Sequence, residues 1–227
     1  MTEQHAPIHG SQVTIEMWAD LGCPWCYLGK HRLSAAIEQR PDADRFEIVV
    51  RSFQLDPSAP QEPEPNETSF IRMHGGTVAD VRRAERQMQA SARAEGLAYS
   101  PDRMNANTFD LHRVVQYAND EGRGSAFFSA VQDGFFAGTL NPYGPGVLAD
   151  VARSVGLDGG RVEQILGSDD HADRVRADRT AGTELGGTGV PFVVVGRRVA
   201  AAGALSVAGY GELLDRVAGP VPSGHAS

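Results

Sequence analysis

Two cysteines, the only two among 227 residues, stand three positions apart in the segment Cys23-Pro24-Trp25-Cys26. If this segment opens a helix, the two Cβ atoms lie roughly 5–6 Å apart, and a disulfide needs about 3.5–4.5 Å. The first turn of a helix can close that gap with little distortion, so the dithiol and the disulfide are both accessible. The spacing therefore predicts a redox centre.

The two thiols are expected to play different roles. At the start of a helix, free backbone N–H groups and the positive end of the helix dipole favour a thiolate at Cys23. We therefore expect Cys23 to be the attacking sulfur and Cys26, one turn further in, to resolve the mixed disulfide. Pro24 removes one backbone donor, and Trp25 offers a flat apolar face beside the reacting sulfur.

Two simpler interpretations of the cysteine pair are a partial zinc site and a pair of inert buried thiols. His31 could add a third zinc ligand. It lies too far along the same helix to share a face cleanly with both thiols, however, and a fourth ligand is missing. Redox chemistry is favoured over both interpretations, and no metal is expected.

A second candidate element is Gly189-Val190-Pro191, which precedes a valine-rich strand. A proline that opens a buried strand gives no ladder hydrogen bond, so its position there needs another reason. A cis Val190–Pro191 bond would expose the Val190 backbone beside the disulfide, ready to pair with an extended substrate segment. An ordinary trans proline is the alternative, and the upstream cysteine pair favours the cis form.

A strand and a helix must position these residues. Residues 13–18 alternate between apolar and polar types, which predicts a strand, and residues 24–39 suit a helix. Residues 46–53 are typical of a second strand. Strand, helix and strand form a βαβ unit with parallel strands, and the cysteine pair lies at the junction of the first strand and the helix.

The proline-rich segment 56–65 predicts a linker or domain boundary, because its prolines hold neither a helix nor a central strand. A helical block follows, and its last helix is expected to be capped by Ser168. Its helices are predicted at 78–95, 109–119, 126–136, 145–155, 161–166 and 169–185. The chain then predicts a strand at 191–195, an antiparallel strand at 199–203 and a helix at 206–217.

These elements predict an α/β fold class, a thioredoxin-like fold interrupted by an all-helical insertion. The core is expected to comprise residues 12–64 and 182–219, and the insertion residues 65–181. The flanking segments 1–11 and 220–227 are expected to be flexible tails.

The composition of the chain restricts the classes of partner that we expect. With 21 Lys and Arg against 29 Asp and Glu, the net charge is −8, which argues against nucleic acid as a partner. The first residues form neither a basic leader nor an apolar stretch, and no run approaches the roughly 18 apolar residues of a membrane span. We therefore expect a cytoplasmic protein without a membrane partner, in which a disulfide is transient and catalytic.

Three segments resemble the DsbA-like family, and in particular its FrnE-like oxidoreductases, which are related to 2-hydroxychromene-2-carboxylate isomerases. Residues 18–30, WADLGCPWCYLGK, resemble the active-site segment. Residues 107–113, NTFDLHR, resemble the motif of the helical insertion, and residues 189–192, GVPF, resemble the cis-proline loop. Together with Ala-Gly-Ala at 202–204, the similarity spans about residues 13–218.

The resemblance implies a thiol–disulfide oxidoreductase with Cys23 as nucleophile, Cys26 as resolving thiol and Pro191 as the cis-proline. It also implies that Asn107 and His112 lie near the active-site cleft, although a histidine on an amphipathic helix is more often structural. The expected partners are a thiol or disulfide protein or small molecule and a cellular reductant or oxidant. No bound cofactor is expected, and glutathione is a candidate co-substrate.

Two other functions compete with this prediction. One is a glutathione-dependent isomerase or transferase of the 2-hydroxychromene-2-carboxylate isomerase type. Those isomerases tend to carry serine at the position of Cys23, so the cysteine favours redox chemistry. The other is a thiol sensor that is oxidised but never turns over a substrate.

Overall fold

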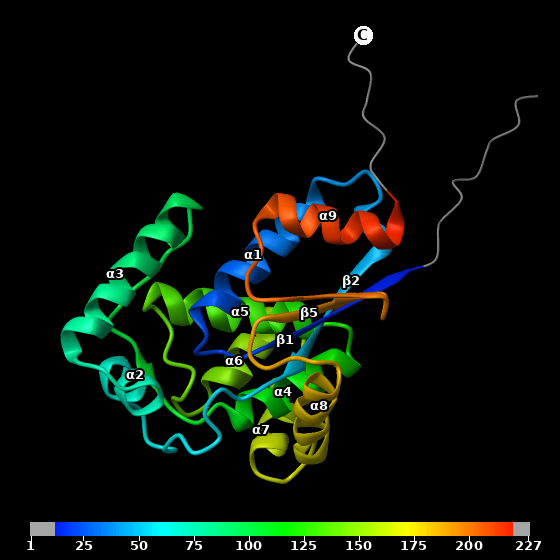
Figure 1. The fold of residues 1–227 in the computed structure, drawn as a ribbon. Coiled ribbons are helices and arrows are strands. Elements are labelled where there is room, and N and C mark those ends of the chain that lie inside the picture. The colour runs from blue at the N-terminus through cyan, green and yellow to red at the C-terminus, as the bar shows by residue number, and fades with distance from the viewer. Residues whose placement is uncertain (1–11, 220–227) are drawn as a thin grey trace, which may run out of the picture.

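A four-stranded sheet forms the centre of the protein in the computed structural model, which describes residues 12–219 (Figure 1). Its strand order is β2-β1-β5-β6. β1 (Val13–Ala19) runs parallel to β2 (Phe46–Ser52), and α1 (Pro24–Glu38) connects them, so the predicted βαβ unit is confirmed. β5 (Phe192–Val195) runs antiparallel to β1 and to β6 (Val199–Ala202), which confirms the predicted antiparallel return.

The central strand β1 is buried on both faces of the sheet, because successive side chains of a strand point to opposite sides. Ile15 and Met17 belong to the main hydrophobic core. Trp18 faces the other way and packs against Phe192, with ring centroids 5.7 Å apart. A Cβ atom at Gly182 would stand 2.7 Å from the Trp18 ring, so only glycine lets the helix that carries it approach the sheet this closely.

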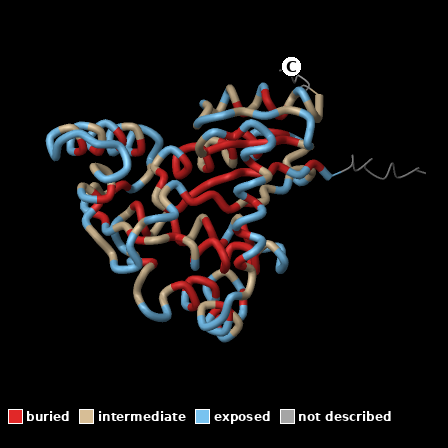
Figure 2. The backbone as a smooth tube through the Cα atoms, turned by 60° about the horizontal axis from the view of Figure 1, so that its bottom comes forward, coloured by how far each residue is buried: buried red, intermediate tan, exposed pale blue. Residues whose placement is uncertain are grey.

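Helices cover both faces of the sheet (Figure 1). α1 and α9 (Val207–Ala218) lie together on one face, whereas α4 (Phe109–Asp120) and α8 (Ala172–Glu184) lie on the other. α5 (Gly124–Ala137) contacts both α1 and β2. The buried backbone is concentrated in the strands and in the helix faces turned toward them (Figure 2). Side chains of the helical block between Met88 and Ile165 therefore belong to the same hydrophobic core as those of β1.

The remaining elements lie before, within or after the helical block, and most of them are short. They are η1 (Ala43–Arg45), β3 (Glu64–Pro65), α2 (Asn66–His74), α3 (Val78–Ala94), β4 (Met104–Asn105), α6 (Val147–Ser154) and α7 (Gly159–Leu166). α2 and the antiparallel pair of β3 and β4 were not among the elements predicted from the sequence. A two-residue pairing leaves no periodicity to read, so the sequence gives no signal for it.

The proline-rich segment 56–65 forms a packed loop. Arg72 in α2 forms ion pairs with Asp56 and with Glu64, at the two ends of the segment. Asn107 donates from Nδ2 to the backbone carbonyl of Pro57, at 3.1 Å. The segment is therefore fixed against the helical block rather than acting as a loose linker.

α8 begins later than predicted. Its first residue is Ala172, and His171 precedes it in a left-handed conformation with φ 65°. The buried Arg113 guanidinium donates to the carbonyl oxygens of Ser168 and Asp170 and so holds them as a turn. The hydroxyl of Ser168 accepts the Asp170 N–H at 3.2 Å, so this serine forms a local turn and does not cap the helix.

An aromatic stack joins α1 to the helical block. The Tyr27 ring in α1 stacks on Phe136 in α5 at 4.6 Å, and Tyr99 stacks on Phe136 at 5.5 Å. The Arg103 guanidinium lies 4.5 Å from the centroid of the Tyr99 ring and pairs with the buried Glu85 at 3.2 Å. This stack fixes the side of α1 that carries the cysteine pair.

Two predictions concern features beyond the sheet and its helices. The expected flexible tails, 1–11 and 220–227, lie outside the described residues. Within residues 12–219, no helix combines the length and the apolar character that a membrane crossing requires.

Candidate active site

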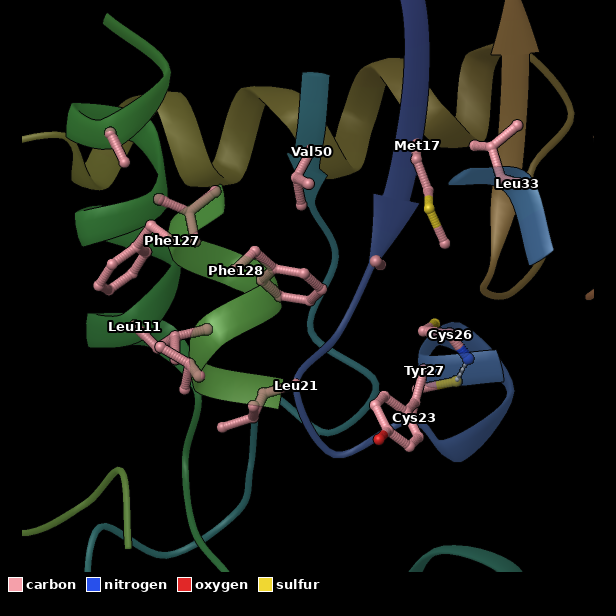
Figure 3. Packing of buried hydrophobic residues seen from close by; sticks show 14 of the residues in the cluster. Met17, Leu21, Cys23, Cys26, Tyr27, Leu33, Val50, Leu111, Phe127 and Phe128 are labelled. Carbon is pink, nitrogen blue, oxygen red and sulfur yellow. Dashed lines mark hydrogen bonds between the residues drawn. The ribbon is translucent and has the colours of Figure 1, made fainter. Parts of the chain in front are cut away.

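The cysteine pair lies at the start of α1, directly after the loop that follows β1. Cys23 is the N-cap residue and Pro24 is the first residue of the helix. The Cys23 sulfur accepts the backbone N–H of Cys26 at 3.2 Å, and both residues are free thiols (Figure 3). A thiolate at this sulfur would keep that hydrogen bond, because a charged acceptor strengthens it.

The two thiols differ in their surroundings. Cys26 is completely buried, whereas 4% of Cys23 is exposed. Burial raises the pKa of Cys26 well above its ordinary value, and the neighbouring Cys23 thiol and the Asp20 carboxylate raise it further. Cys26 therefore stays protonated at neutral pH in the reduced protein.

The loop before β5 approaches the outer cysteine. The Val190 carbonyl oxygen lies 3.7 Å from the Cys23 sulfur, within reach of a weak thiol hydrogen bond, and the Val190–Pro191 peptide bond is cis. Behind the loop, a Cβ atom at Gly29 would stand 3.3 Å from the Pro191 ring and 3.2 Å from the Tyr210 hydroxyl. Glycine at position 29 thus lets α1, the proline loop and α9 pack in contact.

Trp25 lies between the two cysteines in sequence, and 49% of its surface is exposed. It is the most exposed aromatic side chain in the first turn of α1. Its indole is exposed beside the first turn of α1, and its contact with a substrate at Cys23 stays a prediction.

His112 contacts the loop before the cysteines, and no hydrogen bond joins it to a sulfur atom. It is completely buried in α4, and its Nε2 lies 3.1 Å from Oδ1 of Asp20. The same carboxylate accepts the backbone N–H groups of Leu21 at 2.8 Å and Leu55 at 2.7 Å. His112 therefore fixes Asp20, which in turn holds the active-site loop against the strand end of β2.

Asn107 fixes the edge of the site in a similar way. Its Oδ1 accepts the Gln54 side-chain amide at 3.0 Å and the backbone N–H of Phe109 at 2.9 Å. Its Nδ2 donates to the Ala59 carbonyl at 3.2 Å. Asn107 thus ties the packed loop to the start of α4, and its polar atoms are occupied by these contacts.

Two residues that fix the active-site loop, Asp20 and Gln132, were not predicted from the sequence. Asp20 lies three positions before Cys23 and could have been noticed from that position alone. Gln132 in α5 donates to the Asp20 carbonyl at 3.3 Å and to the Leu21 carbonyl at 3.5 Å. Nothing in the sequence marks Gln132, because its partners are more than a hundred residues away.

His31, the third zinc ligand considered from the sequence, points away from the thiols. Its Nε2 pairs with Asp133 in α5 at 2.9 Å. Among residues 12–219, no three side chains of His, Cys, Asp or Glu gather closely enough to hold a metal ion.

Comparison with known families and sequences identifies relatives over most of the chain. A family model described as the DSBA-like thioredoxin domain matches residues 14–215. The uncharacterized protein YwbO of Bacillus subtilis is 26% identical over 191 residues, which cover 82% of this chain and 88% of that protein.

Similar solved structures support the same assignment. A probable DsbA oxidoreductase from Streptomyces coelicolor is 36% identical, with a TM-score of 0.83, and the match covers 90% of this chain and 89% of that one. A 2-hydroxychromene-2-carboxylate isomerase shares the fold at 18% identity and a TM-score of 0.69, covering 89% and 97% of the two chains. The cytosolic disulfide reductase DsbM from Pseudomonas aeruginosa, solved with glutathione, shares it at 16% identity and 0.54, covering 89% and 94%. The predicted thioredoxin-like fold class is confirmed.

Proposed function

Because the chain belongs to the DSBA-like thioredoxin-domain family, we propose that it is a thiol–disulfide oxidoreductase with Cys23 as nucleophile and Cys26 as resolving thiol. The observation that carries this proposal is the asymmetry of the pair. Cys23 caps α1 and accepts the Cys26 N–H, whereas Cys26 is completely buried behind it. A nucleophile at a helix N-terminus with a shielded second thiol suits sequential attack and resolution.

In the reducing direction, the Cys23 thiolate attacks one sulfur of a substrate disulfide. A bond forms between Cys23 and that sulfur, the substrate S–S bond breaks, and the second substrate sulfur leaves as a thiolate that takes a proton from water. The Val190 carbonyl, 3.7 Å from the Cys23 sulfur, is placed to accept a backbone N–H of the bound segment. Pairing of that kind holds the substrate disulfide in line with the attacking sulfur.

Cys26 then resolves the mixed disulfide between Cys23 and the substrate. After it loses its proton, Cys26 attacks the Cys23 sulfur, the Cys23–Cys26 disulfide forms, and the first substrate sulfur leaves as a thiolate. The substrate has then gained two electrons that the cysteine pair has lost, and a cellular thiol reductant restores the dithiol. The reverse sequence oxidises a dithiol substrate. Cys26 is buried, and burial is the main cause of its raised pKa in the dithiol form, so its deprotonation is a step that resolution requires.

Steady-state reduction of a protein disulfide such as that of insulin tests the proposal. Cys23→Ser should lose turnover by about a thousandfold or more, since an essential nucleophile is removed. Cys26→Ser should lose multiple turnover but still form one mixed disulfide per molecule. Equal turnover by wild type and Cys23→Ser would overturn the proposal.

A glutathione-dependent isomerase is the second candidate, favoured by the shared fold of the 2-hydroxychromene-2-carboxylate isomerase. That reaction needs no second thiol, so its turnover with glutathione should survive Cys26→Ala. In the redox proposal glutathione acts as a co-substrate that returns electrons to the pair. Loss of glutathione-supported turnover in Cys26→Ala therefore favours the redox function.

The partners proposed are a thiol or disulfide substrate and a cellular reductant or oxidant, and the proposed compartment is the cytoplasm. Support for this compartment is the fold shared with the cytosolic disulfide reductase of Pseudomonas aeruginosa. Cell fractionation followed by immunodetection tests it. Recovery outside the cytoplasmic fraction would contradict this part of the proposal.

A further inference from the structure

A small cavity lies beside Gly22, the residue that precedes Cys23. Its volume is about 40 Å³, and Ser69 of α2, Asn105 of β4 and Thr108 before α4 line it from the helical block. A Cβ atom at Gly22 would stand 3.7 Å from Oδ1 of Asn105. The missing side chain of Gly22 thus leaves space between the active-site loop and the helical block.

The polar groups that line this cavity lack partners. Ser69 and Thr108 are only 4% and 6% exposed, and neither hydroxyl makes a hydrogen bond to another residue within 12–219. Asn105 donates from Nδ2 to Asn66 at 2.7 Å, but its buried Oδ1 has no partner within the same range. The Tyr143 hydroxyl, which also lines the cavity, is likewise buried without a partner within that range. A buried polar group without a partner costs about 1–3 kcal/mol, so these two atoms, with the unbonded hydroxyls of Ser69 and Thr108 beside them, indicate a place for a hydrogen-bonding guest.

The charges and the size of the cavity restrict that guest. No Lys or Arg lines it, whereas the carboxylates of Asp20 and Asp56 do, so the lining offers an anionic group no cation to bind. Both carboxylates already accept hydrogen bonds, Asp20 from Leu21 and Asp56 from Ser58. A volume of about 40 Å³ is too small for an aromatic ring. A compact neutral group that both donates and accepts remains, which means a hydroxyl or a carboxamide.

The rim of the cavity indicates a polypeptide as the source of that group. Leu55 and Met73 line the cavity, and 38% and 37% of their surfaces are exposed. Trp25, 49% exposed, stands in the first turn after Cys23. Apolar side chains around a small polar cavity suit the chain on either side of a substrate cysteine.

We propose that this cavity is a specificity subsite, which receives the hydroxyl or carboxamide side chain of the residue beside the reacting cysteine in a polypeptide disulfide. Gly22 lines the cavity and directly precedes Cys23, and residues in an extended chain are about 3.3–3.6 Å apart, so we assign the cavity to the side chain next to a substrate cysteine that is bound at Cys23. The inference rests on the proposed redox function and deepens it. It assigns Ser, Thr or Asn as favoured neighbours of the substrate cysteine.

Matched peptide disulfides test the subsite. Thr and Val have the same shape, so disulfides that carry Thr or Val on either side of the cysteine isolate the hydroxyl. When the variable residue stands on the side of the cysteine that faces the cavity, wild type should reduce the Thr peptide with a kcat/KM about tenfold higher than that of the Val peptide. Thr108→Val and Asn105→Leu should bring the Thr/Val ratio close to one. The ratio compares two peptides on one variant, so an overall change in activity cancels.

Met104→Leu serves as the control, because Met104 is exposed beside Asn105 in β4 but does not line the cavity. It should keep the wild-type ratio. A Thr/Val ratio of one in wild type would overturn the subsite and leave the cavity as a water site. Reduction of the aromatic disulfide DTNB by wild type separates the outcomes, since this reagent has no group for the cavity. Wild type that reduces no disulfide at all would overturn the redox function, and the subsite with it.

Discussion

The cysteine pair lies between two regions that contribute different kinds of contact. On the side of the sheet, the closest group is a main-chain oxygen, the Val190 carbonyl, and the proline loop is packed on Gly29. On the side of the helical block, the contacts come from buried polar side chains such as His112 and Gln132. The core thus presents backbone to the Cys23 sulfur, whereas the helical block fixes the loop and lines the proposed subsite.

This difference separates the groups that face the reacting sulfur from the side chains that hold the active-site loop in place. Main-chain contacts depend on the path of the chain and tolerate changes of side chain, as long as the packing behind them is kept. Contacts through side chains such as His112 are lost with one substitution. Changes in the helical block should therefore alter stability or substrate choice, and changes behind the proline loop should alter the redox reaction itself.

The largest effect on stability is expected at Glu85 in α3, which lines no part of the cysteine site. Glu85→Ala leaves the buried Arg103 without its ion pair, which should lower the free energy of unfolding by about 3–5 kcal/mol. Urea unfolding measures this loss. Glu67→Ala, which removes a solvent-exposed pair with Arg82, is the control and should change little. A changed redox potential in folded Glu85→Ala would break the separation between the two regions.

A smaller effect is expected behind the proline loop. Gly29→Val places atoms against Pro191 and Tyr210, where a Cβ already comes within 3.3 Å, and should cost about 1–3 kcal/mol. Because the loop must move, disulfide reduction should slow as well. Gly211→Val in α9, where a Cβ meets nothing within 4 Å, is the matched control. Undiminished turnover by Gly29→Val would show that the loop position does not matter.

The smallest effect concerns the loop that the helical block holds. The Asp20 carboxylate is one of the groups that raise the pKa of Cys26, so Asp20→Asn should lower that pKa. In a Cys23→Ser background, alkylation of Cys26 should then begin at lower pH than it does when Asp20 is present. The rate of iodoacetamide modification against pH measures the shift. No shift, or a shift to higher pH, would contradict the electrostatic role of Asp20.

The local features of the site were predictable from the sequence. The strand, the turn and the helix around Cys23 are set by alternation and by Pro24, which act within a few residues. The prediction that Ser168 caps the last helix of the block is wrong. Its hydroxyl accepts the backbone N–H of Asp170, and Arg113, far away in sequence, holds the turn. Rules that predict helix ends from neighbouring residues cannot take account of an arginine so distant in sequence.

The supporting residues were less predictable. Asp20 and His112 are 92 positions apart, and only the packing of α4 against the sheet brings them together. The resemblance pointed to His112 and Asn107, but their roles became visible only from their hydrogen-bond partners. Gln132 and the unpartnered hydroxyl of Thr108 carry no sequence signal, since their meaning depends on burial.

The most direct test of the central claim is the order in which the two thiols react. Reduced wild type is treated at pH 7 with less than one equivalent of iodoacetamide, and the labelled peptide is sequenced by mass spectrometry. We predict label on Cys23, because Cys26 is completely buried and its pKa is raised. Label found first on Cys26 would contradict the assignment of nucleophile and resolving thiol.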